Sequence, residues 1–293
     1  MKSGIELKRL GTVAADIVEA NPAVFGGRLY RFEYIRESNA GNTTGSSFFR
    51  FIDVASGRST ASFGRGLHMG CAFVSDGRMY VSCVRKWGGS EVLLLWSDDL
   101  LNWSEPEIIL SAPGWEVFNT SICRSADGFT MVFERGRPAP GDVNFTMYFA
   151  YSSDLHDWRV IPGAVYGFGV YCGAPLLRYF DKWYYFFHLS GSYESGFNTM
   201  VSRSKNLKDW SREELVLPYD EADRRWLVPV NAELLERSRR ARNINASDLD
   251  FCEYGGKLYA TYSWGDQRGD EYLALGEADC GEREFCESFF AIR

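Results

Sequence analysis

The sequence predicts an all-β protein, a five-bladed β-propeller with four-stranded antiparallel blades, from three observations. A turn motif occurs three times, as WSDDLLNWSEP at 96–106, YSSDLHDWRVIP at 151–162 and SRSKNLKDWSRE at 202–213. Its tryptophans, Trp103, Trp158 and Trp210, are 55 and 52 residues apart, and a fixed period of this size indicates a repeat architecture. Aromatic residues make up 16% of the chain and are mostly Phe and Tyr, which favour strands.

The turn motif suits a tight connection between two strands of one blade. Each copy contains a Ser, then a Leu, then a Trp, with Asp or Asn between them. Asp and Asn side chains cap such turns by accepting hydrogen bonds from backbone N–H groups, and the Trp ring packs back over the sheet. We therefore expect each copy to join the third strand of a blade to the fourth.

Five segments each contain a predicted hairpin, in which an apolar strand, a short turn and an aromatic strand follow one another. They are 21–34, 67–84, 119–134, 173–188 and 247–264. The middle three continue into third strands at 91–96, 145–150 and 198–202, then into the Trp-marked turn and a short fourth strand. The fifth continues into a strand at 271–276. Four strands in each of five units is the pattern of a five-bladed propeller.

The helical pattern is confined to 221–242, which we interpret as an insertion between blades four and five. Pro229 limits any helix there to the residues that follow it. The chain has no linker and no low-complexity tract, so the sequence predicts one domain over residues 1–293.

Charge and composition argue against several classes of partner. The net charge is −7 and there is no basic block, which disfavours nucleic acid, and we interpret the single basic run at 237–242 as a solvated face. No apolar stretch is long enough to span a membrane, and the N-terminal residues lack the apolar core of a signal peptide, so we expect a cytoplasmic protein. The seven cysteines show no CxxC pair and are expected to be reduced core thiols. Nothing in the sequence specifies the oligomeric state.

The propeller geometry predicts where functional side chains meet. The starts of first strands and the ends of second strands should surround one mouth of the central channel. The side chains at these positions are rich in carboxylates, histidines, arginines and aromatic rings. Such a mouth suits a carbohydrate, because rings cover sugar faces and charged groups bind hydroxyls, while paired carboxylates supply an acid and a base.

The predicted catalytic residues are Asp248, Glu134 and His188. Asp248 begins a channel-lining strand, where it either acts in the site or caps a turn, and Asp250 should share its face as a coupled carboxylate. Glu134 ends an apolar run, so it is either a site residue with a raised pKa or the salt-bridge partner of a neighbouring arginine. His188 is either an acid or a histidine hydrogen-bonded inside the mouth.

The predicted substrate-binding residues are Asn21, His68, Trp87, Asn119, Arg135, Asp250, Trp264 and Asp266. Arg135 and Arg137 would bind a carboxylate or phosphate of the substrate, or else lie on the surface. Trp264 and Asp266 would form a sugar-contacting loop, or else a plain hairpin tip.

The repeated turns, the NPAVF that opens blade one and the GAP that opens blade four resemble the five-bladed glycoside hydrolases of families 43, 32, 117 and 130. The resemblance covers about residues 21–290. It implies carbohydrate-active chemistry at the channel mouth. The acids of family 43, however, are absent from the matching positions, which hold Asn21, Asn119 and Gly173. Family 130 phosphorylases have similar NPA and GAP openings, but their phosphate-binding set cannot be placed residue by residue.

We therefore expect an exo-acting glycoside hydrolase that uses carboxylate or histidine acid–base chemistry. The alternatives are a carbohydrate-binding propeller without catalysis and a glycoside phosphorylase in which mouth arginines and Lys86 hold phosphate. The chemistry requires no cofactor, although the channel carboxylates could hold a metal ion such as calcium.

Overall fold

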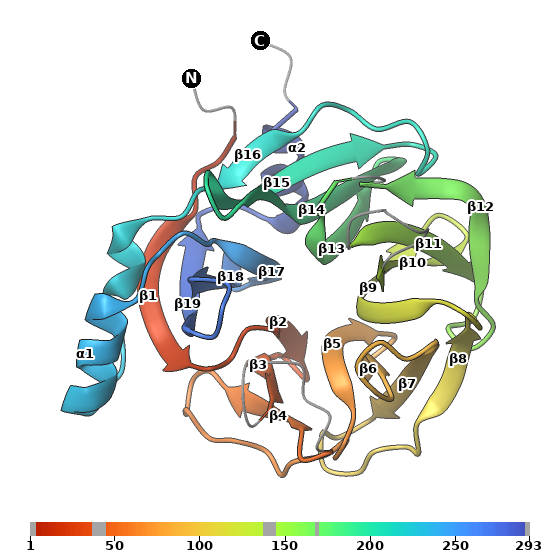
Figure 1. Cartoon of the computed structure of the whole chain (residues 1–293). Coiled ribbons are helices and arrows are strands. Elements are labelled where there is room, and N and C mark those ends of the chain that lie inside the picture. The colour runs from red at the N-terminus through yellow and green to blue at the C-terminus, as the bar shows by residue number, and fades with distance from the viewer. Residues whose placement is uncertain (1–3, 37–44, 137–144, 168–169, 291–293) are drawn as a thin grey trace.

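The computed structural model describes residues 4–36, 45–136, 145–167 and 170–290 (Figure 1). Five antiparallel sheets surround a central axis, which confirms the five-bladed propeller. Blade one contains β2 (Ala20–Phe25), β3 (Arg28–Ile35) and β4 (Phe48–Asp53). Blade two contains β5 (His68–Ser75), β6 (Arg78–Val84), β7 (Glu91–Ser97) and β8 (Glu107–Ser111). Blade three contains β9 (Glu116–Ser125), β10 (Gly128–Gly136), β11 (Thr146–Ser152) and β12 (Arg159–Tyr166).

Blades four and five complete the ring. Blade four contains β13 (Gly173–Phe180), β14 (Trp183–Ser192), β15 (Gly196–Ser204) and β16 (Glu214–Leu217). Blade five contains β17 (Ser247–Tyr254), β18 (Lys257–Gly265) and β19 (Glu271–Ala278), and its outer strand is β1 (Lys8–Ala15) from the other end of the chain. The register runs from Lys8 opposite Glu277 to Ala15 opposite Tyr272. The hairpin pattern, which starts at residue 21, did not predict this closing strand.

Blade one differs from the predicted four strands. Its outer strand β4 forms only isolated bridges to the following segment, between Phe49 and Phe63 and between Ile52 and Ser59. The backbone of Phe49 and Phe63 exchanges two hydrogen bonds of 2.8 and 3.0 Å, so this segment covers the edge of β4 without forming a regular strand.

The three Trp-marked turns join β7 to β8, β11 to β12 and β15 to β16, as the sequence predicts. Each turn is held by a serine hydroxyl, which accepts the backbone N–H of the leucine three residues later at 2.9–3.0 Å. These leucines adopt left-handed backbone angles, with φ of 63°, 75° and 62°. The indole of Trp103 stacks on Phe63 with ring centroids 3.7 Å apart. The motif is therefore a fold element at the outer side of each blade.

The described part of the chain contains three short helices. The insertion between blades four and five contains the 3-10 helix η1 (Glu221–Arg224) and the predicted helix α1 (Ala232–Arg240). Asn231 caps α1 by accepting the Leu234 N–H at 2.8 Å. The expectation that helix is confined to 221–242 is wrong, because α2 covers Glu282–Ser288. Burial of Phe285 against Phe187 and Phe251 stabilises this short helix, and packing of this kind leaves little periodic signal in seven residues.

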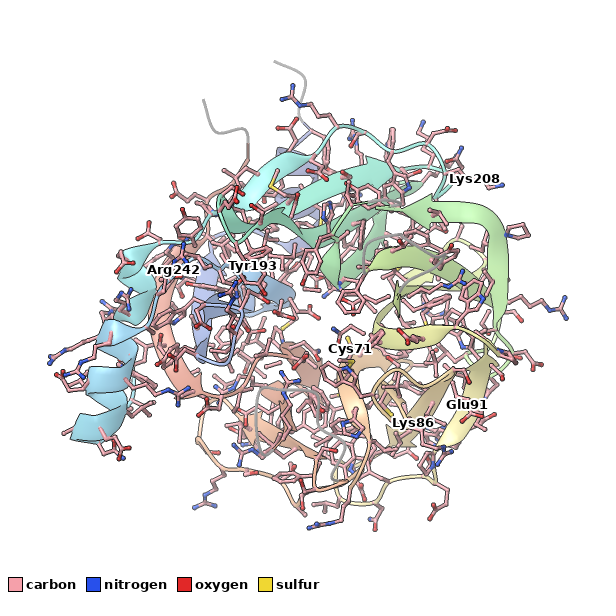
Figure 2. All side chains as sticks on the ribbon, in the orientation of Figure 1. Cys71, Lys86, Glu91, Tyr193, Lys208 and Arg242 are labelled. Carbon is pink, nitrogen blue, oxygen red and sulfur yellow. The ribbon has the colours of Figure 1, made fainter. Side chains whose placement is uncertain are left out.

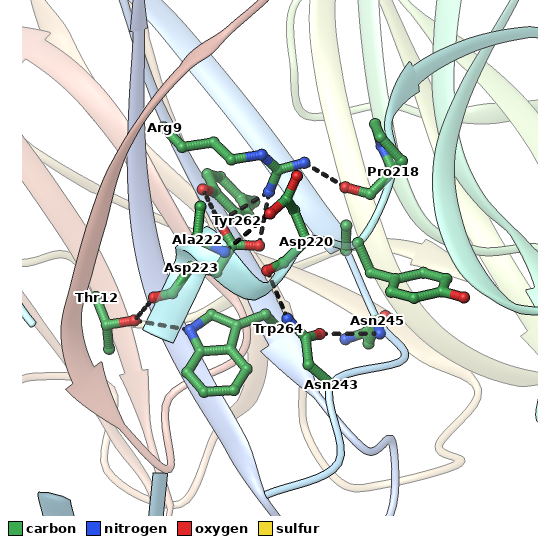
Figure 3. A network of polar contacts seen from close by, with 12 residues as sticks. Arg9, Thr12, Pro218, Asp220, Ala222, Asp223, Asn243, Asn245, Tyr262 and Trp264 are labelled. Atoms are coloured by element: carbon green, nitrogen blue, oxygen red, sulfur yellow. Dashed lines mark hydrogen bonds and ion pairs between the residues drawn. The ribbon is translucent and has the colours of Figure 1, made fainter. Parts of the chain in front are cut away.

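A buried polar network fixes the closing seam to the insertion (Figure 3). Asp223 pairs with Arg9 of β1 at 2.6 Å and accepts the hydroxyl hydrogen of Tyr262 at 2.6 Å. Thr12 of β1 donates to the backbone carbonyl of Asp223 and accepts the indole N–H of Trp264 at 2.7 Å. The insertion is therefore packed as part of blade five.

All seven cysteines are free thiols, and six of them are buried, as predicted. None of the helices in the described part of the chain has the length and apolar character needed to cross a membrane.

Candidate active site

A cavity of about 550 Å³ opens at one end of the central channel. Starts of inner strands, the end of β10 and the loop 266–270 contribute to its wall. The cavity narrows to a waist of about 40 Å³, and a second mouth of about 380 Å³ opens on the opposite face. Cys71 lies near the centre of the ring and lines both the waist and the second mouth (Figure 2). The first cavity has the size of a typical small-molecule site.

One backbone feature recurs around the mouth. Met69, Ala174 and Asp248 are each the second residue of an inner strand, and their φ angles are 52°, 54° and 53°. The pairing register shifts at each of these positions, and all three residues line the cavity. Left-handed backbone is uncommon for residues other than glycine, and it breaks the alternation of side chains along a strand. As a result, Asp248 lines the candidate site, whereas Asp250 lines the opposite mouth.

Glu134 is a deeply buried carboxyl of the mouth, at 2% exposed. One of its oxygens accepts the Ala174 N–H at 2.7 Å, and the other accepts the backbone and side-chain N–H groups of Asn119 at 3.2 and 3.1 Å. Burial raises the pKa of Glu134 to about 8, although these donors favour the ionised form. The group is therefore fixed in position and mostly protonated at neutral pH.

Gly173 lies directly beside this carboxyl. A Cβ atom at Gly173 would lie 3.7 Å from the Oε1 atom of Glu134 and 3.5 Å from the hydroxyl of Tyr171. That separation is comparable to the reach of a glutamate side chain from Cβ to its carboxylate. The carboxyl of Glu134, from blade three, thus occupies the space that an acid at position 173 of blade four would reach.

Asp248 lies in the same cavity, and Glu19 and Arg36 line its wall. Burial, and next the charge of Glu19, raise the pKa of Asp248 to about 7, while a hydrogen bond from the Ser247 hydroxyl acts in the opposite direction. Glu19 itself forms an ion pair with Arg36 at 3.4 Å. The mouth therefore contains two carboxyls that titrate near neutrality and a third that is paired.

Glu271 is a further buried acid of the cavity, 2% exposed, that sequence reasoning missed. Burial, and next the charge of Asp248, raise its pKa well above the usual range. The amide of Asn245 donates to Glu271 at 3.5 Å and to the Ser247 hydroxyl at 2.9 Å. Glu271 is the first residue of the third strand in blade five. The prediction considered only the starts of first strands and the ends of second strands, so it did not include this position.

Four of the predicted binding residues line the channel, and Asp250 is the one among them that lines the waist and the opposite mouth. Trp87 and Asn119 line the cavity. Asn21 lies lower, at the waist, where its side chain exchanges hydrogen bonds of 2.7 and 2.9 Å with the backbone of Ala72 in the next blade. Both ends of the Asn21 amide are therefore used to join blades one and two.

The two predicted histidines are buried beside the channel and are not part of the cavity wall. His188 packs between Tyr166 and Phe186, and burial lowers its pKa to about 4. His68 hydrogen-bonds to the hydroxyl of Tyr34 at 2.8 Å. His68 is thus a hydrogen-bonded interior histidine. The Nε2 atom of His188 lies 3.7 Å from the Glu213 carboxylate and has no hydrogen-bond partner in the described part of the chain.

The remaining predicted residues lie away from the cavity wall. The guanidinium of Arg135 stacks on Trp115 at 3.7 Å. Trp264 is fully buried on Tyr272, with ring centroids 4.3 Å apart. Asp266 accepts backbone N–H groups inside its own loop, and Asp250 pairs with Arg178 at 2.7 Å. Arg137 lies outside the described residues.

The described part of the chain contains no set of ligands for the metal ion considered from the sequence. No group of three or more His, Cys, Asp or Glu side chains there is arranged to hold a metal ion. A calcium ion in the channel therefore stays a prediction, and no chemistry is assigned to it.

Comparisons with known proteins identify solved structures of similar fold but no matching family. No family model matches the chain, and neither does any curated protein. Among solved structures, a thermostable family-43 glycoside hydrolase is 11% identical, with 92% of this chain and 91% of that chain covered and a TM-score of 0.60. An α-L-arabinanase from Cellvibrio cellulosa, solved as a mutant, is 12% identical, with 90% and 92% covered and a TM-score of 0.57. A xylan β-1,4-xylosidase from Bacillus halodurans is 14% identical at a TM-score of 0.58, and the match covers 92% of this chain but 54% of that one. The chain therefore has the five-bladed fold on which these glycoside hydrolases are built.

Proposed function

We propose that the protein is a glycoside hydrolase that cleaves a sugar from the end of an oligosaccharide or glycoside at this mouth. The observation that supports this most is the carboxyl of Glu134, which is buried, held by three N–H groups and located beside Gly173. In the resembled family 43 the general acid projects from the position of Gly173. The protonated carboxyl of Glu134, which comes from blade three, would supply the general acid that position 173 of blade four lacks.

The two mouth carboxyls suit opposite roles. Glu134 would donate its proton to the glycosidic oxygen as the bond to the anomeric carbon breaks. Asp248, with the lower pKa of the two, would accept a proton from the water whose oxygen bonds to that carbon. Glu19 faces the same cavity, but its ion pair with Arg36 makes it a weaker candidate for this step. His188 has no role in this scheme, because it does not line the cavity.

The shape of the channel supports cleavage at a chain end. The cavity of about 550 Å³ narrows to a waist of about 40 Å³, so a ligand that enters from the mouth meets a constriction. A terminal sugar would occupy the funnel while the rest of the substrate extends outwards.

The direct test is substitution of each carboxyl. Glu134→Gln and Asp248→Asn should each lower kcat/KM on a panel of aryl glycosides by about 100-fold or more, since acid–base catalysis contributes on that order. Glu253→Gln, an exposed residue of the opposite mouth, is the control and should retain activity. Full activity in both site variants would eliminate this assignment.

The pH dependence gives an independent test. Activity should fall below about pH 7, where Asp248 becomes protonated, and above about pH 8, where Glu134 loses its proton. A narrow bell-shaped profile of kcat/KM is expected, and Asp248→Asn should remove its acidic limb from any residual activity. A profile that is flat from pH 6 to 9 would contradict the proposed pair.

A carbohydrate-binding propeller without catalysis is the second candidate. Asn21 favours it, because the position of the family 43 base is occupied by an amide that joins two blades. Sugar binding without release of product over the whole glycoside panel would decide for this candidate. The phosphorylase alternative has less support, because Lys86 and Arg135 do not line the cavity and Lys86 lies over blade two, away from the centre (Figure 2). Of the two arginines that do line it, Arg36 is paired with Glu19, which leaves Arg268.

A further inference from the structure

The loop 266–270 forms one side of the mouth and has a fixed conformation. Asp266 accepts the backbone N–H groups of Arg268 and Asp270 at 2.7 and 3.1 Å. Asp270 pairs with Arg237 of α1 at 2.7 Å, and Arg237 also pairs with Asp16 of the chain that follows β1. The insertion thus fixes this side of the mouth to blade five.

Arg268 is the exposed cation of this loop, and it lines the cavity. Its guanidinium lies over the ring of Tyr193, 4.3 Å from the centroid. Tyr193 in turn donates its hydroxyl hydrogen to the carbonyl of Gln267 at 3.2 Å and packs edge-on against Phe197. The ring therefore acts as a platform that orients the guanidinium, which leaves its N–H groups available at the edge.

The other charged groups of the cavity are accounted for inside the protein. Glu19 and Arg36 pair with each other. Glu134 and Glu271 are buried, and burial favours their neutral forms. Among the residues that the structure describes, no carboxylate forms an ion pair with Arg268. Asp248 also lines the cavity and is the proposed base, but it forms no ion pair with Arg268 in the described part of the chain. The mouth thus presents an oriented cation that no ion pair with a neighbouring carboxylate occupies.

We propose that Arg268 binds the carboxylate of a uronic acid residue in the substrate, so that the site selects acidic sugars over neutral ones. The proposal deepens the proposed function, because it takes the cavity to be a sugar site. A guanidinium binds a carboxylate through two parallel N–H···O bonds, and this pairing is stronger than a hydrogen bond to a sugar hydroxyl. The placement on a tyrosine ring lowers the entropy lost when the pair forms.

Calorimetric titration tests this without any need for turnover. The probes are D-galacturonic acid and D-glucuronic acid, each compared with its methyl ester and with the neutral hexose. At pH 7.5 and low salt at least one acid should bind about 10- to 100-fold more tightly than its ester, as expected for a charge-assisted pair. Arg268→Gln should remove this preference while leaving the affinity for the ester unchanged.

Arg242→Gln is the matched control. Arg242 is also exposed and donates to the backbone carbonyl of the same Tyr193 at 3.4 Å, but it does not line the cavity (Figure 2). Its loss should leave the preference for the acid intact. Equal affinity for acid and ester, absence of binding by both acids, or an unchanged preference in Arg268→Gln would each overturn the proposal. The proposed hydrolysis fails on different evidence, namely full turnover by Glu134→Gln and Asp248→Asn.

Discussion

The two mouths of the channel are built from the same inner strands but differ in how their carboxyls are compensated. At the opposite mouth Arg178 pairs with Asp250 at 2.7 Å and with Glu282 at 2.9 Å. At the candidate site burial raises the pKa values of Glu134 and Asp248 to about 8 and about 7, and the opposing charge of Arg36 is the smallest influence on Asp248. Burial also raises the pKa of Asp250, but Arg178 opposes it and the value is about 6.

The two mouths differ in what their charged groups can do: those of one mouth stabilise the fold, and those of the other are suited to acid–base chemistry. One mouth is lined by a salt-bridge network that ties β13 to β17 and α2. The other mouth keeps buried carboxyls in a cavity, which costs stability and leaves groups that exchange protons near neutral pH. Unpaired buried acids in a cleft are more typical of a functional site than of a structural one.

Removal of the cation at the opposite mouth should have the largest effect on stability. Arg178→Met leaves two partly buried carboxylates without a partner, and breaking such a pair typically costs about 3–5 kcal/mol. The free energy of unfolding, from urea titration at pH 7, should fall by that order. Adding Asp250→Asn and Glu282→Gln should recover much of the loss. A loss below about 1 kcal/mol would mean that the network does not stabilise this mouth.

The buried carboxyl of the candidate site should make stability depend on pH. The pKa of Glu134 is about 8 in the folded protein and its usual value is 4.5, so the folded state holds this proton more tightly than the unfolded chain does. Its contribution to stability is complete below about pH 4.5 and is lost as the pH rises through about 8.

Unfolding free energies at pH 5, 7 and 9 test this dependence. Glu134→Gln should make the decline from pH 5 to pH 9 shallower, whatever its effect on stability at pH 5. Glu105→Gln, at an exposed position, serves as the control and should keep the wild-type slope. An unchanged slope in Glu134→Gln would show that this carboxyl is ionised throughout.

A smaller effect is expected from the aromatic wall of the candidate site. Trp87 lines the cavity, with its ring beneath the guanidinium of Arg36 and edge-on to Phe118. Trp87→Ala should weaken binding of a sugar ligand by about three- to tenfold, the scale of one aromatic contact. Trp96→Ala, in the outer part of blade two, should leave the affinity unchanged. Equal affinities in both variants would remove Trp87 from the binding surface.

The fold could be predicted from the sequence because its signals are local. The Ser–Leu–Trp turns are held by hydrogen bonds that span three residues, so each copy carries its own evidence. The fourth strand of blade five could not be found this way, because it pairs with residues at the other end of the chain. The three-stranded blade one was also missed, since the segment beside β4 has no regular pattern to distinguish it.

The candidate site was predicted in part. Glu134, Asp248, Trp87 and Asn119 line the cavity because the ends of strands were correctly placed at the mouth. Asp250 was expected beside Asp248, and both line the waist, but Asp250 extends into the opposite mouth while Asp248, with its left-handed backbone, extends into the candidate site. Arg135 follows Glu134, which lines the cavity, and its guanidinium packs on Trp115 instead. Trp264 is covered by Tyr272. Side-chain alternation alone does not reveal such bulges.

The strand β1 also determines when the molecule can finish folding. Lys8 and Glu277, which pair across the closing seam, are separated by 269 positions. During synthesis the hairpins of the first four blades can form as they leave the ribosome, but the ring has no closed state until β19 has emerged. Contacts of such long range make the last step slow, and β19 remains an exposed strand edge until β1 covers it. The strand β1 is thus made before the five inner strands and is among the last elements to reach its final place.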